Sequence, residues 1–434
     1  MSFDGANGTN PQGALVQATD GNFYGTTQYG GANGFGTVFR LTPAGVLTTM
    51  QSFGTSAGFA PEAGLIVGAN GDLYGTTSND AGGGSAFEMT LSGVLTTLSD
   101  QVESLPIAPL LQGTDGNFYG TTSLGPGFFG AVFQVTPSGV LTYLHVFDES
   151  DGGHPAAGLV EGPDGNYYGS TEFYGANDLG CGTFGCGTLF RITPAGVLTT
   201  LVNFEFPQGI HPIGSLYMDI TGTIYGTDAY GGTSTNCKNY PNGAGCGTIF
   251  TLAADGDFTR LYSFDGTDGF GPTGPLLLAS DGNFYGTTLF GGAHGYGTIF
   301  KISPTGNLTT LYSFNFSDGS QPGPLMQATD GSFWGLSSKG GASRNGVAFT
   351  ISAGLPAFIK TVPTAAAAGT QVQILGTNLS AASQVTFNGI AAPFTVISAS
   401  LITSPVPSGA TTGKVEVTTP SGNLSNIGLF QVLP

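Results

Sequence analysis

The chain has 434 residues, of which 75 are glycine and only 8% are charged. Its 27 acidic and 9 basic side chains give a net charge of −18, which argues against nucleic acid or an anionic membrane as partner, because both bind through Lys and Arg. Hydrophobic residues make up 40% of the chain and include 32 Phe, enough for a folded core despite the glycine content. No apolar run approaches the roughly 18 residues that cross a bilayer, so we expect no membrane insertion.

One motif, Asp281-Gly-Asn-Phe-Tyr-Gly-Thr-Thr288, organises the first 354 residues. Related copies begin at Asp20, Asn70, Asp115, Asp164, Thr221, Asp281 and Asp330. The intervals between them are 45 to 60 residues, a period typical of the blades of a β-propeller. A β-solenoid is the alternative, but its coils usually hold about 20 to 30 residues.

Repeat six shows what one period encodes. Extended runs at 272–280, 283–290, 298–303 and 307–314 are separated by an Asp-Gly hairpin signal, a Gly-rich loop and a Pro-x-Gly turn. We therefore predict an all-β fold, with a seven-bladed β-propeller of four-stranded blades over residues 1–354. Both short turns lie on one face of such a blade. The Gly-rich loop and the crossover to the next blade lie on the other, where length varies and binding is usually found.

Repeats four and five depart from the others at the crossover and at the end of the second strand. Each has a His before the proline that opens the repeat (His154 and His211) and an acid at the strand end (Glu172 and Asp228). The other repeats carry Asn10, Ala60, Leu105, Gly271 and Gln321 before that proline. Two His and two carboxylates on neighbouring blades could bind a divalent metal or act as acid and base, although unrelated loop residues are the commoner explanation.

The enlarged loops of these two repeats contain all the cysteines, spaced as Cys181-x4-Cys186 and Cys237-x8-Cys246. Such short spacings favour two local disulfides, which suit an exported protein. A four-thiolate zinc site and pairing across blades are the alternatives.

A stapled loop is pre-organised for a ligand, so we predict the ligand site over repeats four and five. Its residues would be His154, His211, Glu172 and Asp228, with Phe173 and Tyr230 as aromatic walls. Across the repeats, Tyr29, Phe173, Tyr230 and Phe290 share one loop position, and Phe35 and Tyr296 share another. Rings at these positions suit sugar stacking, while packing between neighbouring blades is the alternative.

Acidic residues also cluster in two crossovers. Asp148, Glu149 and Asp151 precede repeat four, and Asp265 and Asp268 precede repeat six. Carboxylates in Gly-rich loops can hold Ca²⁺, but their spacing matches no EF-hand, and Asp is a standard turn residue. Ca²⁺ is thus a possible cofactor, with solvated turns the commoner explanation.

The seventh repeat stops after its third strand, near Ile351. We predict that the last blade is three-stranded, or is completed by Met1–Phe3 or by Leu355–Thr361. From residue 355 the glycine content falls, and strands are predicted at 357–362, 370–376, 384–388, 395–397, 401–406, 413–419 and 428–433. Short strands over about eighty residues suggest an immunoglobulin-like β-sandwich at 355–434.

Both parts resemble known families. The pattern Asp-Gly-Asn-Phe-Tyr-Gly-Thr-Thr with Gly-Thr-Val-Phe and Thr-Pro-Ala-Gly-Val-Leu-Thr-Thr resembles the tandem GloVer repeat of choice-of-anchor bacterial surface proteins, over residues 1–354. The segment from Pro356, with Ala-Gly369-Thr and Gly376-x-Asn-Leu, is similar to an IPT/TIG domain. The resemblance implies an exported, surface-associated protein and assigns no chemistry.

The leading interpretation is therefore a secreted or cell-surface propeller that binds a glycan or another cell-surface ligand, with the IPT/TIG domain as spacer. The N-terminus carries no basic and apolar signal sequence, so we expect the export signal to lie upstream. A polysaccharide lyase or hydrolase is the second interpretation, because propellers host both. A purely structural or adhesive role is the third.

Overall fold

The computed structural model describes residues 1–54, 58–78, 83–102, 105–176, 181, 184–237 and 245–433. These residues form an all-β structure, with a short 3-10 turn, η3 (Leu379–Ala381), in its C-terminal part. No helix in them is long and apolar enough to cross a membrane.

Within the described residues, the chain up to Ile351 forms seven antiparallel sheets, six of four strands and the last of three. The first three sheets contain β1 (Val16–Gln17), β2 (Phe23–Thr27), β3 (Thr37–Leu41), β4 (Leu47–Ser52); β5 (Ile66–Val67), β6 (Leu73–Thr77), β7 (Gly84–Met89), β8 (Leu95–Val102); and β9 (Leu111–Gln112), β10 (Phe118–Thr122), β11 (Ala131–Val135), β12 (Leu141–Val146). The next two contain β13 (Val160–Glu161), β14 (Tyr167–Thr171), β15 (Thr188–Ile192), β16 (Leu198–Asn203); and β17 (Tyr217–Met218), β18 (Ile224–Asp228), β19 (Thr248–Leu252), β20 (Phe258–Ser263). The last two contain β21 (Leu277–Leu278), β22 (Phe284–Thr288), β23 (Thr298–Ile302), β24 (Leu308–Ser313); and β25 (Ser320–Gln327), β26 (Phe333–Lys339), β27 (Val347–Ile351).

The four-strand order predicted for repeat six is confirmed, except that its first strand is much shorter than the predicted run 272–280. Only Leu277 and Leu278 pair with the second strand. Pro272 and Pro275 lie in the same run and have no N–H to donate to a ladder, which explains why regular pairing begins only after them.

The Gly-Thr-Thr part of the motif joins each sheet to the next. A Cβ at Gly286 would lie 2.5 Å from the Phe300 ring, so glycine lets that ring cover the second strand. The Thr287 hydroxyl donates a 3.0 Å hydrogen bond to the Gly323 carbonyl of the following repeat. Equivalent bonds join Thr26 to Ala63, Thr76 to Pro106, Thr121 to Ala157, Ser170 to Pro212 and Thr227 to Gly274.

The Asp-Gly turn is built around its own side chain. Asp281 Oδ1 accepts the Asn283 N–H at 3.1 Å, and Oδ2 accepts the Tyr285 hydroxyl at 3.1 Å and Lys301 Nζ at 2.8 Å. Burial raises the pKa of this carboxyl, but the bonds from Lys301, Asn283 and Tyr285 outweigh it, so the pKa lies below its ordinary value. The recurring Asp of the motif therefore stabilises the turn through its hydrogen bonds.

The last sheet has three strands, and the N-terminus extends it. Ser2 forms an antiparallel bridge with Val347, and the Phe3 N–H donates to the Gly346 carbonyl at 3.0 Å. Of the predicted alternatives, the structure shows a three-stranded sheet to which Met1–Phe3 adds a single bridge. The alternative segment, 355–361, instead leads into β28 (Lys360–Val362), which pairs with β30 (Gln371–Leu375).

The seventh sheet also contacts the first in the way that other consecutive sheets contact each other. A Cβ at Gly346 would lie 2.6 Å from Pro11 Cδ, just as one at Gly297 would lie 2.6 Å from Pro322 Cδ. The Thr329 N–H donates to Gln17 Oε1 at 3.0 Å. The sequence of sheets thus returns to its beginning.

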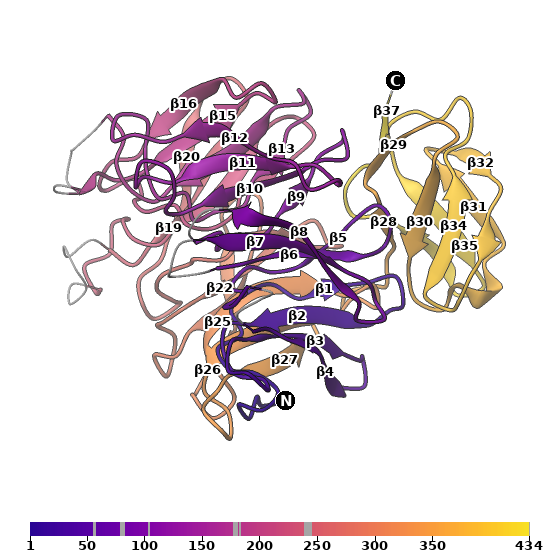
Figure 1. The fold of residues 1–434 in the computed structure, drawn as a ribbon, viewed down its shortest axis with the longest axis horizontal. Helices are drawn as coiled ribbons and strands as arrows, with labels where there is room; N and C mark the ends of the chain where they lie inside the picture. Colours follow the sequence, from indigo (N-terminus) through magenta and orange to yellow (C-terminus); the bar gives the residue numbers. More distant parts are fainter. Residues whose placement is uncertain are drawn as a thin grey trace.

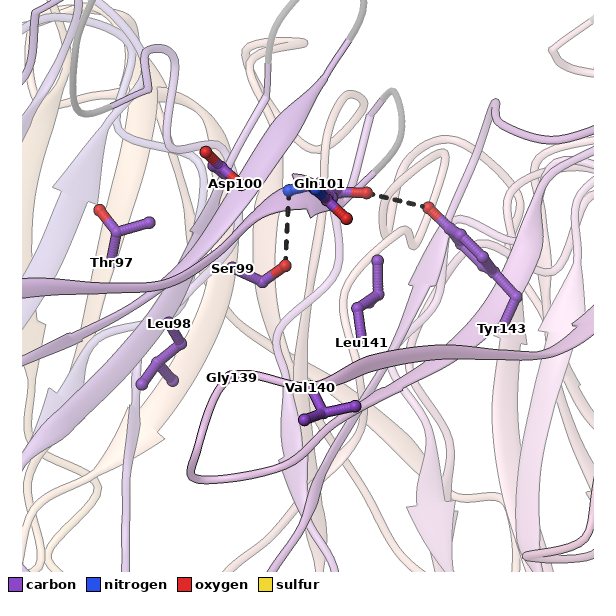
Figure 2. A pocket seen from close by; sticks show the side chains of 9 residues that line it. All are labelled: Thr97, Leu98, Ser99, Asp100, Gln101, Gly139, Val140, Leu141 and Tyr143. Carbon is purple, nitrogen blue, oxygen red and sulfur yellow. Dashed lines mark hydrogen bonds between the residues drawn. The ribbon is translucent and has the colours of Figure 1, made fainter.

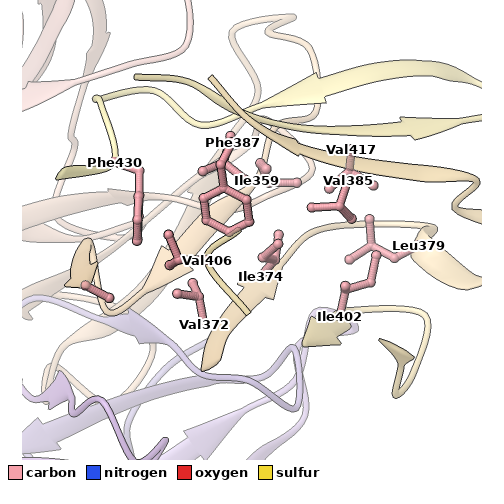
Figure 3. Close-up of a cluster of buried hydrophobic side chains, with 12 residues drawn as sticks. Ile359, Val372, Ile374, Leu379, Val385, Phe387, Ile402, Val406, Val417 and Phe430 are labelled. Carbon is pink, nitrogen blue, oxygen red and sulfur yellow. The ribbon is translucent and has the colours of Figure 1, made fainter. Parts of the chain in front are cut away.

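The C-terminal residues form two four-stranded sheets and one parallel strand pair. The strands are β28, β29 (Ala365–Ala367), β30, β31 (Gln384–Phe387), β32 (Ile390–Ala392), β33 (Thr395–Val396), β34 (Leu401–Pro405), β35 (Val415–Thr419), β36 (Gly422–Ser425) and β37 (Gln431–Leu433). The alternating pattern predicts seven of them and misses β29, β32 and β36. Side chains from both sheets, among them Ile374, Phe387 and Val417, share one buried core (Figure 3).

This C-terminal unit lies against the face of the repeats that carries the Asp-Gly turns, next to β1, β5 and β9 (Figure 1). The Thr329 and Thr377 hydroxyls are 3.0 Å apart, and the Phe358 N–H donates to the Thr329 carbonyl. The Gly-rich loops instead form bridges with the crossovers, for example Phe173 with Gly153 and Tyr230 with Ile210. The loop and crossover side therefore carries the residues predicted to bind ligand.

Candidate ligand-binding site

The two crossover histidines occupy a position that clamps neighbouring repeats together. The His154 N–H donates to the Phe129 carbonyl of the preceding repeat at 2.7 Å, and its carbonyl accepts the Glu172 N–H at 3.2 Å. His154 has a φ of 55° and His211 a φ of 57°. The equivalent residues Asn10, Ala60, Leu105, Gly271 and Gln321 have φ values between 52° and 67°. The left-handed backbone therefore belongs to the scaffold, which leaves the side chain free to vary.

The imidazoles of His154 and His211 both contact the ring of Phe173. Phe173 lies between them, with its centroid 5.6 Å from that of His154 and 4.7 Å from that of His211, both edge to face. Tyr230 follows, 5.5 Å from His211. All four rings are partly exposed. Residues from repeats four and five thus form one continuous surface, as the sequence predicts.

Glu172 supplies the carboxylate of this surface. Its Oε1 lies 3.6 Å from His211 Nδ1, and the two side chains are 27% and 14% exposed. The distance is too long for a hydrogen bond but short enough for an ion pair when the imidazole is protonated. The pair therefore offers a ligand both a carboxylate acceptor and an imidazole N–H donor.

Asp228 does not share that surface. Its side chain is fully buried at the end of β18, where Thr248 Oγ1 donates to Oδ2 at 2.5 Å and Oδ1 has no hydrogen-bond partner. Burial raises the pKa of this carboxyl to about 8, although the bond from Thr248 lowers it. In the sheet register Asp228 corresponds to Thr288, whereas Glu172 lies one residue beyond that position. The two acids therefore occupy positions one residue apart, and Asp228, which was expected in the ligand site, is buried in the interior instead.

Sequence reasoning missed further aromatic residues of the surface. Tyr174 stacks on His154 at 6.0 Å and meets Phe129 of the third repeat edge to face at 5.1 Å. Phe184 lies 6.2 Å from Phe173 and is 60% exposed. Phe128, at 83%, is more exposed still. The unusual Phe-Phe pair in the third Gly-rich loop was the available signal. We call His154, Glu172, Phe173, Tyr174, Phe184, His211 and Tyr230 the aromatic surface.

Local disulfides support this region. Cys181 pairs with Cys186, and Cys237 pairs with Cys246, which confirms the favoured pairing over a zinc site or pairing across blades. The Cys186 carbonyl accepts the His211 N–H at 3.0 Å, so the first disulfide is tied directly to a site residue. Residues 177–180, 182–183 and 238–244 of the enlarged loops lie outside the described residues.

Elsewhere the same loop positions are used for packing. Phe290 stacks on Phe270 at 5.7 Å, Phe35 lies 5.6 Å from Phe59, and Tyr296 lies 5.4 Å from Phe316. Each pair joins a Gly-rich loop to a crossover. The packing alternative therefore describes these rings, although Tyr29 remains 49% exposed.

The acidic crossovers hold their own turns. Asp265 Oδ1 accepts the Thr267 N–H and hydroxyl, and Asp268 accepts the Asp265 N–H and the Tyr262 hydroxyl. Asp148 and Asp151 are bonded in the same way, with His145 Nε2 2.7 Å from Asp151 Oδ2. Among the residues that the structure describes, no group of three or more His, Cys, Asp or Glu is arranged to hold a metal.

A polar hollow lies on the outer rim, between β8 of the second sheet and the β11–β12 turn of the third (Figure 2). The Tyr143 hydroxyl donates to the Gln101 carbonyl at 3.3 Å across it. Asp100 is its one charged lining residue among those described, and none of the predicted site residues lies there. Its described lining residues include no imidazole and no group of contacting aromatic rings like those of the aromatic surface.

Comparison with known proteins places these features in a family. The profile of the Gloeobacter/Verrucomicrobia repeat matches residues 1–181, 106–243 and 237–391, and that of the IPT/TIG domain matches 356–432. No curated protein matches the chain.

Among solved structures, a streptogramin B lyase shares 16% identity at a TM-score of 0.54, with 81% of this chain and 95% of that chain covered. Virginiamycin B lyase from Staphylococcus aureus shares 14% at 0.53, with 80% and 97% covered. Hydrazine synthase from Kuenenia stuttgartiensis shares 12% at 0.53, with 79% and 96% covered. At these identities the likeness shows the fold, which for the two lyases is a β-propeller. The chain belongs to the Gloeobacter/Verrucomicrobia repeat family and carries an IPT/TIG domain after its repeats.

Proposed function

We propose that this is an exported protein, secreted or on the cell surface, that binds a glycan through its aromatic surface. Its seven sheets are the blades of a closed propeller over residues 1–354. The IPT/TIG unit, 355–434, is an immunoglobulin-like sandwich that acts as a spacer on the opposite side. The return of the seventh sheet to the first supports the closed ring.

The composition of the aromatic surface favours a sugar over other ligands. Aromatic rings present flat apolar faces, while the imidazoles and the Glu172 carboxylate can exchange hydrogen bonds with hydroxyl groups. Among the described residues, no Lys or Arg belongs to the surface, which disfavours phosphate and sulfate groups. Small-molecule sites combine apolar walls with a few placed polar groups in this way.

One observation carries the proposal: Phe173 is held between His154 and His211 beside Glu172, on a disulfide-tied loop. A fixed loop has less conformational entropy to lose when a ligand binds. In the plain repeats Phe35 and Tyr296 each pack against a crossover ring, and these pairs lack both the crossover histidines and the acid.

A polysaccharide lyase or hydrolase is the second candidate, favoured by the contact between Glu172 and His211. A carboxylate beside an imidazole can orient it and stabilise its protonated form, as a general base requires. The propeller lyases support this candidate through fold alone, because they share only 14 to 16% identity with the chain.

A panel of immobilised polysaccharides, scored for retention and for product release, tests both candidates. Retention without turnover supports the binding protein, and new reducing or unsaturated ends support the enzyme. If neither is seen, both candidates are wrong and a structural role stands.

The double change His154→Ala with His211→Ala should weaken retention at least about tenfold, a loss of about 1.4 kcal/mol. The melting temperature should change little, because Ala60 already occupies this left-handed position in repeat two. Gln321→Ala, at the same position of repeat seven, is the matched control. Binding that survives the double change but is lost in Tyr29→Ala would place the site elsewhere.

A further inference from the structure

A second candidate site lies on the other side of the repeats, where they meet the C-terminal unit. A cavity of about 500 Å³ opens between the inner strands β1, β5 and β9 and the start of the C-terminal unit. Its walls are mainly apolar and include Leu15, Leu65, Leu111, Met326, Phe358 and Leu429. Its volume is within the range of about 300 to 1,000 Å³ typical of small-molecule sites.

One cation faces this apolar space. Lys360, the first residue of β28, is the only charged side chain among the described residues that line the cavity. Its Nζ donates to the Gln327 carbonyl at 2.5 Å and lies 3.6 Å from the Met326 sulfur. An ammonium has three donors, and a thioether is a weak acceptor, so these contacts leave donor capacity unused.

Among the described residues no carboxylate pairs with this ammonium, whose remaining contact is the Phe358 ring, 5.6 Å from Nζ. The chain carries 27 acidic residues, yet none of them lines this cavity among the described residues. Burial lowers the pKa of Lys360 to about 8. A cation surrounded by apolar side chains is costly unless an anion pairs with it, so the cavity supplies what a ligand carboxylate would complete.

We propose that this cavity binds an amphipathic carboxylate, with its tail between the inner strands and the C-terminal unit and its carboxylate on Lys360 Nζ. The apolar walls favour removal of the tail from water, and the ion pair fixes the orientation of the ligand. The site is independent of the aromatic surface in position and in chemistry. A fatty acid and the C-terminal carboxylate of an apolar peptide share this chemistry.

Calorimetric titration of the full chain with decanoate and with decanol tests the charge. Wild-type protein at pH 7 should bind decanoate at least about tenfold more tightly than decanol. Lys360→Met should remove that preference while keeping the apolar contacts. Lys339→Met, which neutralises an exposed lysine at the end of β26, should leave it unchanged. Equal binding of both ligands to wild-type protein, or a preference retained by Lys360→Met, overturns the proposal.

The pH dependence gives a second readout that does not rely on the methionine variant folding. Decanoate stays ionised from pH 7 to pH 10, and no other charged side chain among the described residues lines the cavity. Wild-type affinity should therefore fall above about pH 8 as Lys360 loses its proton, whereas Lys360→Arg should hold its affinity to pH 10. Loss at the same pH in both proteins contradicts the assignment. A peptide ligand is tested by titrating acetyl-Leu-Leu as the free acid and as the amide. Whichever carboxylate binds more tightly, decanoate or acetyl-Leu-Leu, shows whether the site suits a fatty acid or a peptide C-terminus.

Discussion

Repeats five and six end their second strands with different residues at one backbone position. In repeat six, Thr288 Oγ1 accepts the Thr298 N–H at 3.1 Å and donates to the Phe290 carbonyl at 2.9 Å. In repeat five, Asp228 accepts one bond from Thr248 and leaves its second oxygen without a partner. A hydroxyl is satisfied in this interior position, while a carboxyl is not. The same fold position can thus carry very different free-energy costs.

The comparison extends to the loops above these strands. Repeats four and five carry the disulfides and the crossover histidines. In repeat six, Phe270 of the crossover and Phe290 of the Gly-rich loop stack on each other instead. The elaborated repeats keep the backbone clamp of the plain ones at unchanged φ. Variation is therefore confined to side chains and loop lengths that the scaffold does not need.

Exchanging the strand-end residues Asp228 and Thr288 should change the free energy of unfolding more than any other substitution considered below. The folded pKa of Asp228, about 8, lies above the unfolded value of about 3.9. Between these values the folded state holds a proton that the unfolded state has released, so stability falls as pH rises from about 4 to about 8, by up to about 1.4 kcal/mol per pH unit. Asp228→Thr should remove this slope and raise the free energy of unfolding by about 2–4 kcal/mol at pH 7.

Urea unfolding at pH 5 and at pH 7.5 measures that slope. The reciprocal change Thr288→Asp should introduce a similar slope into repeat six, because that site is also fully buried. If Asp228→Thr leaves the pH dependence unchanged, the carboxyl is already ionised in the folded protein and the comparison fails.

Removal of a disulfide should have a smaller effect, confined to the elaborated repeats. Cys181→Ser with Cys186→Ser opens a link between residues 5 apart in sequence, and should lower the free energy of unfolding by about 2–3 kcal/mol at most. A reductant should destabilise wild-type protein but leave a variant lacking all four cysteines unchanged. If both respond equally, the reductant acts elsewhere.

The turn ion pair of repeat six should matter least. Lys301 Nζ lies 2.8 Å from Asp281 Oδ2, and the Lys301 side chain is 36% exposed. Lys301→Met should cost about 0.5 kcal/mol and less at high salt, because solvent screens the pair. Repeat two performs the same task without a cation, since Asn70 Nδ2 donates to Glu88 Oε1 at 2.9 Å. A loss above about 2 kcal/mol would show that the repeats are not interchangeable here.

The site was only partly predictable from the repeat alignment. His154, His211, Phe173 and Tyr230 meet because they occupy matching positions in consecutive repeats, which spacing alone reveals. Asp228 was misplaced because a strand end cannot be fixed to one residue without its register, and one residue changes the side that a side chain faces. Phe184 lies in an enlarged loop that has no counterpart in the plain repeats.

The period, the four strands of the first six repeats and the two family assignments could be predicted from the sequence, because each depends on residues close together in the chain. The sequence favoured local disulfides but left a zinc site and pairing across blades open, and the structure shows the local pairs. Which groups are buried, and which residues face them, became known from the three-dimensional structure. Lys360 and Leu111 are far apart in sequence, and nothing in either segment predicts that they line one cavity. Burial and the pKa shifts that follow from it depend on such long-range contacts, which a local pattern does not encode.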